Sequence, residues 1–138
     1  MPKYLLIVDY RPGVVDTPMD QWKPDEIDAH MNYYDALNRD LAGTGELVGG
    51  EALTGPEFGK QVVADGVTAP VVTDGPYAEA KEMLAGFQIV EVESEARAIE
   101  IAAKISQVPG PGGVPQQQPI GVRRLMQACD FELLMPDQ

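Results

Sequence analysis

The spacing of apolar and polar positions along the chain predicts four strands of a sheet, separated by helices and a hairpin. Nearly continuous apolar runs favour strands that other elements cover, whereas alternation favours a strand with one face in water. These patterns predict strands over residues 4–8, 46–53, 87–93 and 120–126. In the alternating third stretch, Phe87 and Ile89 are expected on the covered face and Gln88 on the wet face.

Two segments carry the 3.6-residue repeat of an amphipathic helix. The first is predicted to begin at Pro24, which suits the first helical turn, and to end near residue 42. The second follows Ser94, a good N-cap. The packed face of the first helix is expected to hold Ile27, Met31, Tyr34, Asn38 and Leu41, and Leu37 extends it on one side. His30 falls between Leu37 and Leu41, on this face or at its border. The packed face of the second is expected to hold Ala98, Ile101, Ala102 and Ile105.

Turn-forming residues mark the remaining connections. Short arms over 61–66 and 69–73 predict a β-hairpin whose second arm ends at Asp74. Residues 77–83 are good helix formers but are too few for more than one turn. Residues 108–119 contain four prolines and three glycines, so they are predicted to form a loop.

The predicted order of elements is strand, helix, strand, hairpin, strand, helix and strand. It indicates an α+β fold: a ferredoxin-like antiparallel sheet with two helices on one face and an inserted β-hairpin. Because the other sheet face would lack a cover, we expect it to be buried against a second copy, which makes the protein a homodimer. One domain is expected over residues 1–127, followed by an acidic C-terminal tail over residues 128–138.

Composition and charge narrow the range of partners. The 138 residues include ten basic and 22 acidic side chains, which gives a formal net charge of −12. A nucleic-acid backbone or an anionic membrane would repel such a chain, and no long apolar run predicts a membrane span. Cys129 is the only cysteine, which excludes an internal disulfide and agrees with a cytoplasmic location. With one histidine and no thiolate cluster, no metal site and no cofactor are expected.

His30, the only histidine, is the first candidate for chemistry, because an imidazole can take and return a proton near neutral pH. A general base needs an orienting partner, and Asp74 at the end of a predicted strand is a suitable one. Both residues also have a structural interpretation: His30 as a packed side chain bonded to a backbone carbonyl, and Asp74 as a turn residue that caps the backbone after it. Further candidates, for substrate binding, are Tyr77, Lys81, Glu82, Glu51 and Arg123.

Each substrate-binding candidate likewise has two interpretations. Lys81-Glu82 either binds a substrate carboxylate and exchanges a proton, or is a solvated pair on a short turn. Tyr77 either packs in the core or lines a pocket and presents its hydroxyl there. Trp22 either packs in the core or stacks on a planar ligand. Glu51 and Arg123 either line a cavity or form a buried ion pair.

Residues 73–82 read Thr-Asp-Gly-Pro-Tyr-Ala-Glu-Ala-Lys-Glu, which resembles the DGPFAETKE signature of the DGPF branch of the YCII-related family. The chain differs at Tyr77, where that signature has Phe, and at Ala80, where it has Thr. The resemblance implies a dimeric α/β barrel and a His–Asp pair, which falls on His30 and Asp74. Further similarity, which together covers residues 1–127, lies at Lys3 to Ile7, His30-Met31, Gly50 to Leu53 and Gly86-Phe87.

The resemblance points to two functions, and a structural dimer without chemistry is a third interpretation of the sequence. In the first, a small dimeric enzyme uses His30 and Asp74 as a dyad for proton transfer, in a lyase or dehydrochlorinase-like step on a small organic molecule. In the second, the same cavity binds a ligand without catalysis, in a regulatory module associated with sigma-factor-linked transcription. The two hypotheses differ at His30. A dyad needs the ring in a solvent-reachable pocket within hydrogen-bond distance of a carboxylate, whereas a module tolerates its loss if packing survives.

Overall fold

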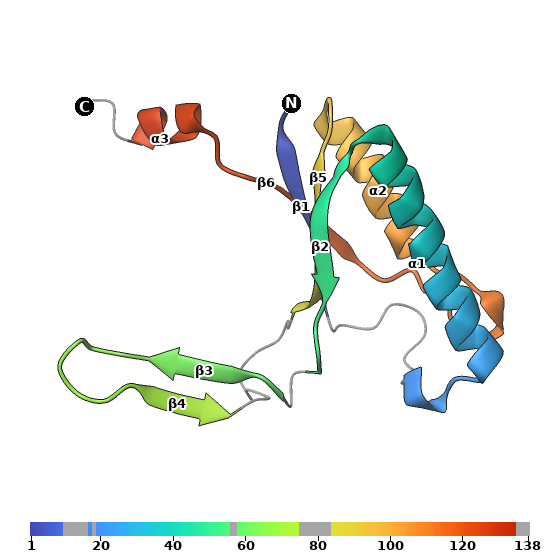
Figure 1. Ribbon diagram of the computed structural model, residues 1–138, viewed down its shortest axis with the longest axis horizontal. Helices are drawn as coiled ribbons and strands as arrows, with labels where there is room; N and C mark the ends of the chain where they lie inside the picture. The colour runs from blue at the N-terminus through green and yellow to red at the C-terminus, as the bar shows by residue number, and fades with distance from the viewer. Residues whose placement is uncertain (10–16, 18, 56–57, 75–83, 135–138) are drawn as a thin grey trace.

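The computed structural model describes residues 1–9, 17, 19–55, 58–74 and 84–134. Within them the chain forms an α+β fold, as predicted, with an antiparallel sheet, three α-helices and a separate hairpin (Figure 1). The strands are β1 (Lys3–Asp9), β2 (Leu47–Ala52), β3 (Lys60–Val63), β4 (Val71–Asp74), β5 (Leu84–Glu91) and β6 (Ile120–Arg124). The helices are α1 (Pro24–Thr44), α2 (Glu95–Ser106) and α3 (Ala128–Leu134), with short 3₁₀ turns η1 (Met19–Gln21) and η3 (Pro111–Gly113).

Four strands form the main sheet in the order β2, β5, β1, β6, and every neighbouring pair is antiparallel. Leu6 on β1 lies opposite Gln88 on β5 and Val122 on β6. α1 and α2 cover the same face of the sheet, with α2 against β1 and β6 and α1 against β2 (Figure 1). The arrangement is consistent with the ferredoxin-like fold that the element order predicted.

The hydrophobic core lies between the sheet and these two helices. Leu6 and Val90 are fully shielded from solvent at the centre of the sheet. α1 contributes Leu37 and Leu41, and burial of each such side chain stabilises the fold by about 1.5–3 kcal/mol. The buried residues of α2 are those of the predicted stripe: Ala98, Ile101, Ala102 and Ile105.

Local signals at both ends position α1. Glu26 Oε1 accepts a hydrogen bond of 2.9 Å from the backbone N–H of Lys23, and Gly45 ends the helix with a φ of 81°. Trp22, just before the helix, is buried, and its Nε1 donates to the carbonyl oxygen of Thr17 at 2.9 Å. The first turns of α1 are therefore fixed against the segment that precedes them.

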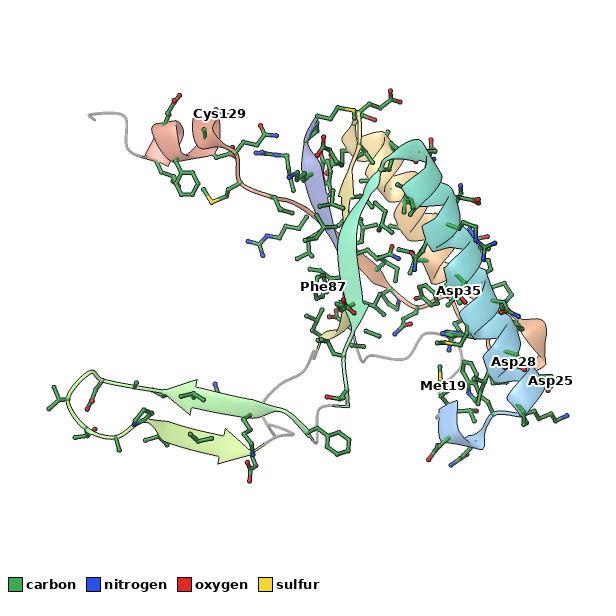
Figure 2. All side chains as sticks on the ribbon, in the orientation of Figure 1. Met19, Asp25, Asp28, Asp35, Phe87 and Cys129 are labelled. Carbon is green, nitrogen blue, oxygen red and sulfur yellow. The ribbon has the colours of Figure 1, made fainter. Side chains whose placement is uncertain are left out.

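The side chains of β5 point to the opposite faces of the sheet from those expected from the sequence. Gln88 lies opposite Leu6, on the face that the helices cover, whereas Phe87 and Ile89 lie on the open face. Figure 2 shows Phe87 pointing to the side of the sheet away from α1. Val90, and not Ile89, enters the core. Because successive side chains of a strand point to opposite faces, Gln88 then faces the helices and Phe87 and Ile89 face away from them.

The packed face of α1 also differs from the helical wheel. Met31, expected on that face, is exposed, and the buried residues of the helix are His30, Leu37 and Leu41. The buried side of the helix is the one that carries Leu37 and Leu41, which belong to the core, and His30, against which Trp22 packs edge-on. Asp25, Asp28 and Asp35 are exposed on α1 (Figure 2).

β3 and β4 form a hairpin that extends away from the main sheet (Figure 1). Its register, which the sequence left unassigned, pairs Lys60 with Asp74 and Val63 with Val71. The second strand ends at Asp74, as predicted. Every residue of both strands is exposed, so the hairpin has no core of its own in the single chain. The helical turn predicted over residues 77–83 lies outside the described residues.

α3 forms within the tail, for which no helix was predicted. Asp130 explains it: its carboxylate accepts from the backbone N–H of Gln127 at 2.7 Å and from two nitrogens of Arg124 at 2.9 and 2.7 Å. One side chain therefore both caps the first turn and anchors the helix to the end of β6. Among the described residues, no helix is long and apolar enough to cross a membrane.

Candidate functional site around His30

His30 lies in the first third of α1 with only 8% of its surface exposed. Its Nδ1 is 3.0 Å from the carbonyl oxygen of Pro109. Because a carbonyl oxygen only accepts hydrogen bonds, Nδ1 carries the proton and donates it. Nε2 of the neutral ring then presents a lone pair, and none of the described side chains hydrogen bonds to it. The structure thus holds the imidazole in one tautomer and one orientation.

Two aromatic rings flank the imidazole. The ring centroid of Trp22 lies 5.4 Å away in an edge-on arrangement, and that of Tyr34 lies 5.2 Å away and is tilted. Burial among these groups lowers the pKa of His30 below its usual 6.5, although the bond to Pro109 acts in the opposite direction. The neutral form of His30 therefore predominates at neutral pH, and this is the form that can accept a proton.

Pro109 belongs to the proline- and glycine-rich loop that follows α2, and hydrogen bonds hold this loop in place. Gln116 N donates to Val108 O at 3.0 Å, which closes the loop on itself. Gly112 N donates to Glu26 Oε2, which ties the loop to the first turn of α1. A segment predicted only as a loop is therefore a fixed support for the carbonyl group that orients His30.

A polar stripe continues along α1 toward the sheet. Tyr34 and Asn38 follow His30 at intervals of four residues, so the three side chains share one side of the helix. Gln88 of β5 reaches this stripe, and its Nε2 donates to Asn38 Oδ1 at 2.5 Å. Burial, with a smaller contribution from the neighbouring Tyr33, raises the pKa of Tyr34 to about 12, so its hydroxyl keeps its proton.

Sequence reasoning identified His30 but missed Pro109 and Gln88. A loop carbonyl carries no side-chain signal, and Pro109 is 79 residues away along the chain. Gln88 was expected in solvent because of its polarity. The spacing of Tyr34 and Asn38 from His30 was the one available signal, since residues four apart meet on a helix surface.

The structure does not bring Asp74 to His30 within one chain. Asp74 lies at the end of the hairpin, is exposed, and binds Lys60 Nζ at 2.6 Å. The hairpin and the first half of α1 are on different sides of the molecule (Figure 1). The group that orients the imidazole in the single chain is the carbonyl of Pro109.

Glu51 and Arg123 both lie on the open face of the sheet, opposite Phe87 and Leu5 respectively. They belong to the two edge strands, β2 and β6, with β5 and β1 between them. Neighbouring strands are about 4.8 Å apart, so the two side chains do not form the ion pair considered from sequence. Tyr77 and the Lys81-Glu82 pair lie outside the described residues.

In the part of the chain that the structure describes, no three His, Cys, Asp or Glu side chains are grouped closely enough to hold a metal ion. The polar side chains that the site itself offers are one imidazole, one phenol and two carboxamides, from His30, Tyr34, Asn38 and Gln88.

Two comparisons with known proteins bear on this arrangement. The family described as the YCII-related domain matches residues 2–114. That range contains His30, the aromatic rings beside it, Gln88 and Pro109, and it ends before β6 and α3. No curated protein matches the chain.

Proposed function

Because this chain belongs to the YCII-related family, we propose that it is a homodimer that binds a small organic molecule beside His30 and uses this ring to accept a proton. One observation carries the proposal: a neutral imidazole whose Nδ1–H is fixed to Pro109 O and whose Nε2 is left as an acceptor. Membership of the DGPF branch is part of the proposal and rests on the sequence of residues 73–82.

Proton abstraction by Nε2 fits a lyase or dehydrochlorinase-like step. The proton of an acidic C–H bond passes to Nε2, the electron pair of that bond forms a carbon–carbon double bond, and a leaving group such as chloride departs with its own bonding pair. The imidazolium then releases the proton to water. The lowered pKa of His30 keeps the basic form available at neutral pH.

In this proposal Pro109 O takes the part that a carboxylate plays in a His–Asp dyad. It fixes the tautomer, but it does not add a negative charge to stabilise the imidazolium. Asp74 is bonded to Lys60 in its own hairpin. A dyad of His30 with Asp74 therefore requires the hairpin of a second copy.

The homodimer is supported by the apolar surfaces that one chain leaves uncovered. The open sheet face carries Leu5, Ile7, Phe87 and Ile89, all of them partly exposed. The hairpin adds valines that are 55–63% exposed, namely Val62, Val63, Val71 and Val72. A stable interface buries about 800 Å² on each partner, and two sheets packed through their open faces would form a dimeric α/β barrel.

One observation favours a second function, a ligand-binding module without catalysis and with a regulatory role such as one linked to sigma-factor-dependent transcription. His30 is nearly enclosed and its orienting group is neutral, which is also how a packed structural histidine is held. In that case the ligand contacts the site, but no proton is transferred.

An NMR titration of the ¹⁵N-labelled ring of His30, in the wild type and in Asp74→Asn, tests the state of the base. We expect the Nδ1–H tautomer and a pKa below 6.5 in the wild type. If His30 has the same pKa in Asp74→Asn as in the wild type, Pro109 is the only group that orients the ring. If the pKa of His30 is clearly lower in Asp74→Asn, Asp74 of a second copy lies beside the ring. A charged ring at neutral pH would overturn the proposal.

Halide release from small organic chlorides that carry an acidic C–H bond on the carbon next to the C–Cl carbon separates the two functions. Release that is lost in His30→Gln while the ligand still binds supports the enzyme. Binding without release in both proteins supports the module. If no small molecule perturbs the His30 signals, neither function holds for this site.

A further inference from the structure

We infer that Gln88 and Asn38 form the recognition end of the site, and that they select a neutral, planar ligand that donates a hydrogen bond through an O–H or N–H group. The inference rests on the proposed function of His30, because both ends of the polar stripe would contact the same ligand. It adds the chemical class of that ligand.

The side chain of Gln88 has a hydrogen-bond acceptor without a partner in the described part of the chain. Gln88 Oε1 is buried and has no hydrogen-bond partner among the described residues. The hydrogen bond from its Nε2 to Asn38 Oδ1 holds the amide in this orientation. A buried polar atom without a partner is unfavourable, and such atoms are rare in folded proteins. A carboxamide that is held with one open acceptor is therefore suited to bind a donor from outside the chain.

The second support is the bare surface next to Gln88. Its partner on β2 is Gly50, and the following pair along the same face is Gly86 with Ala52. Gly50 and Ala52 are exposed although they lie on the helix-facing side of the sheet, so α1 does not cover this corner. A Cβ atom at Gly50 would lie 3.0 Å from the side chain of Gln88. Gly50 and Ala52 thus leave the β2 side of Gln88 without a covering side chain.

The third support is the chemistry along α1. Tyr34 lies midway between His30 and Asn38, with a rise of about 6 Å along the helix to each of them. None of the described side chains hydrogen bonds to its hydroxyl, and its ring contacts the imidazole of His30. Flat aromatic surfaces favour a planar ligand through stacking or edge contacts.

The open positions at the two ends are both lone pairs: Nε2 of His30 and Oε1 of Gln88. A carboxylate would place its own lone pairs against either of them and be rejected, whereas a phenol, an aniline or a primary aromatic amide donates a hydrogen to Gln88 Oε1 and extends its ring along Tyr34 toward His30. A site that expects a donor discriminates strongly against an analogue that lacks it, because its own polar groups are then left unpaired.

The test compares phenol with anisole, and benzamide with N,N-dimethylbenzamide, as ligands of the full chain. Binding is followed through the side-chain amide signals of Gln88 and the ring signals of His30 in ¹H–¹⁵N spectra. We expect phenol and benzamide to shift both sets of signals, and the methylated analogues to bind roughly tenfold more weakly or not at all. This comparison needs no variant, so it stands even if substitutions in the core unfold the chain.

Gln88→Met removes the acceptor and keeps the length of the side chain, and Gln61→Met on the exposed hairpin is the matched control. In Gln88→Met the preference for the donor-bearing ligand should fall to about onefold, while the control keeps it.

Two outcomes would overturn the inference. The first is a preference for phenol over anisole that persists in Gln88→Met while the ring signals of His30 still shift. This result would exclude Gln88 as the recognition group and leave the proposed function of His30 intact. The other is the absence of any shift at Gln88 with all donor-bearing ligands. If Gln88 responds but His30 does not, the recognition end stands and the proposed function of His30 fails.

Discussion

The guanidinium group of Arg97 binds the carboxylate of Glu46 through two nitrogen atoms, with Nε 2.8 Å from Oε2 and Nη2 2.9 Å from Oε1. Glu46 lies between α1 and β2, and Arg97 lies in the first turn of α2. This pair joins the ends of the two helices that cover the sheet. The bond to Arg97, with a smaller one from Thr44, lowers the pKa of Glu46 from 4.5 to about 2.

Acid should weaken the fold through this pair. A carboxyl group whose pKa is lower in the folded state stabilises the fold above pH 4.5, and this stabilisation is lost as the pH falls toward 2. We expect Glu46→Gln to lose about 1–2 kcal/mol of unfolding free energy near neutral pH and to show a flatter acid profile. Urea unfolding at a series of pH values measures both. Glu95→Gln, an exposed position on α2, is the control, and equal losses at every pH would contradict the role of the charge.

His30 should add a second pH dependence at higher pH. Its folded-state pKa lies below 6.5, so the unfolded chain binds the proton more readily. The contribution to stability is therefore complete above pH 6.5 and is lost as the pH falls through the folded-state pKa. His30→Gln removes the titrating group, and its unfolding free energy should change less between pH 7 and pH 5 than that of the wild type. Parallel profiles for the two proteins would show that His30 is not held neutral.

Gly50 should tolerate no side chain. A Cβ atom at this position would lie 2.5 Å from Phe87 O and 2.9 Å from Gln88 Cα, and both are backbone atoms that cannot move without disturbing the sheet. Gly50→Ala should lower the unfolding free energy by roughly 1–3 kcal/mol. A Cβ atom added at the neighbouring Gly49 would have no other atom within 4 Å, so Gly49→Ala should be neutral or slightly stabilising. Thermal unfolding of the two variants gives the comparison, and equal melting temperatures would contradict it.

A charge on the open sheet face should separate the proposed dimer. Ile7 lies at the centre of this face, between Phe87 on β5 and Gly121 on β6. We expect the wild type to sediment as a dimer in analytical ultracentrifugation and Ile7→Lys to sediment as a monomer, because a lysine would be buried without a partner. Ile99→Lys places the same charge on an exposed apolar position of α2 and should leave the dimer intact. A monomeric wild type, or a dimer that survives Ile7→Lys, would reject this interface.

The elements that carry strong local signals were predictable from sequence. Ser94 was identified as an N-cap, and its hydroxyl accepts from Arg97 N at 3.3 Å. Gly45 ends α1 because it adopts a left-handed conformation that other residues rarely take. Such signals lie within a few residues of their effect, so they need no knowledge of the rest of the fold.

The facing of β5 and the group that orients His30 were not predictable in the same way. Phe87 and Ile89 are apolar enough for a core, and polarity alone does not separate a core from a surface that a second copy covers. Pro109 contributes only its backbone carbonyl, and its distance from His30 depends on how α2 and its loop pack against α1. Tertiary packing decides both features.

The backbone amides of the β3–β4 hairpin should be less protected from hydrogen exchange than those of the main sheet. Its amides are bonded only within a two-stranded ribbon, and such ribbons are marginally stable alone. The amides of β1 lie between two partner strands and beneath the helices. In hydrogen exchange the hairpin should therefore open locally and lose its protons early, whereas β1 exchanges only when the whole domain unfolds. Slow exchange at Val62 and Val72 would then be a direct signature of contact with another molecule.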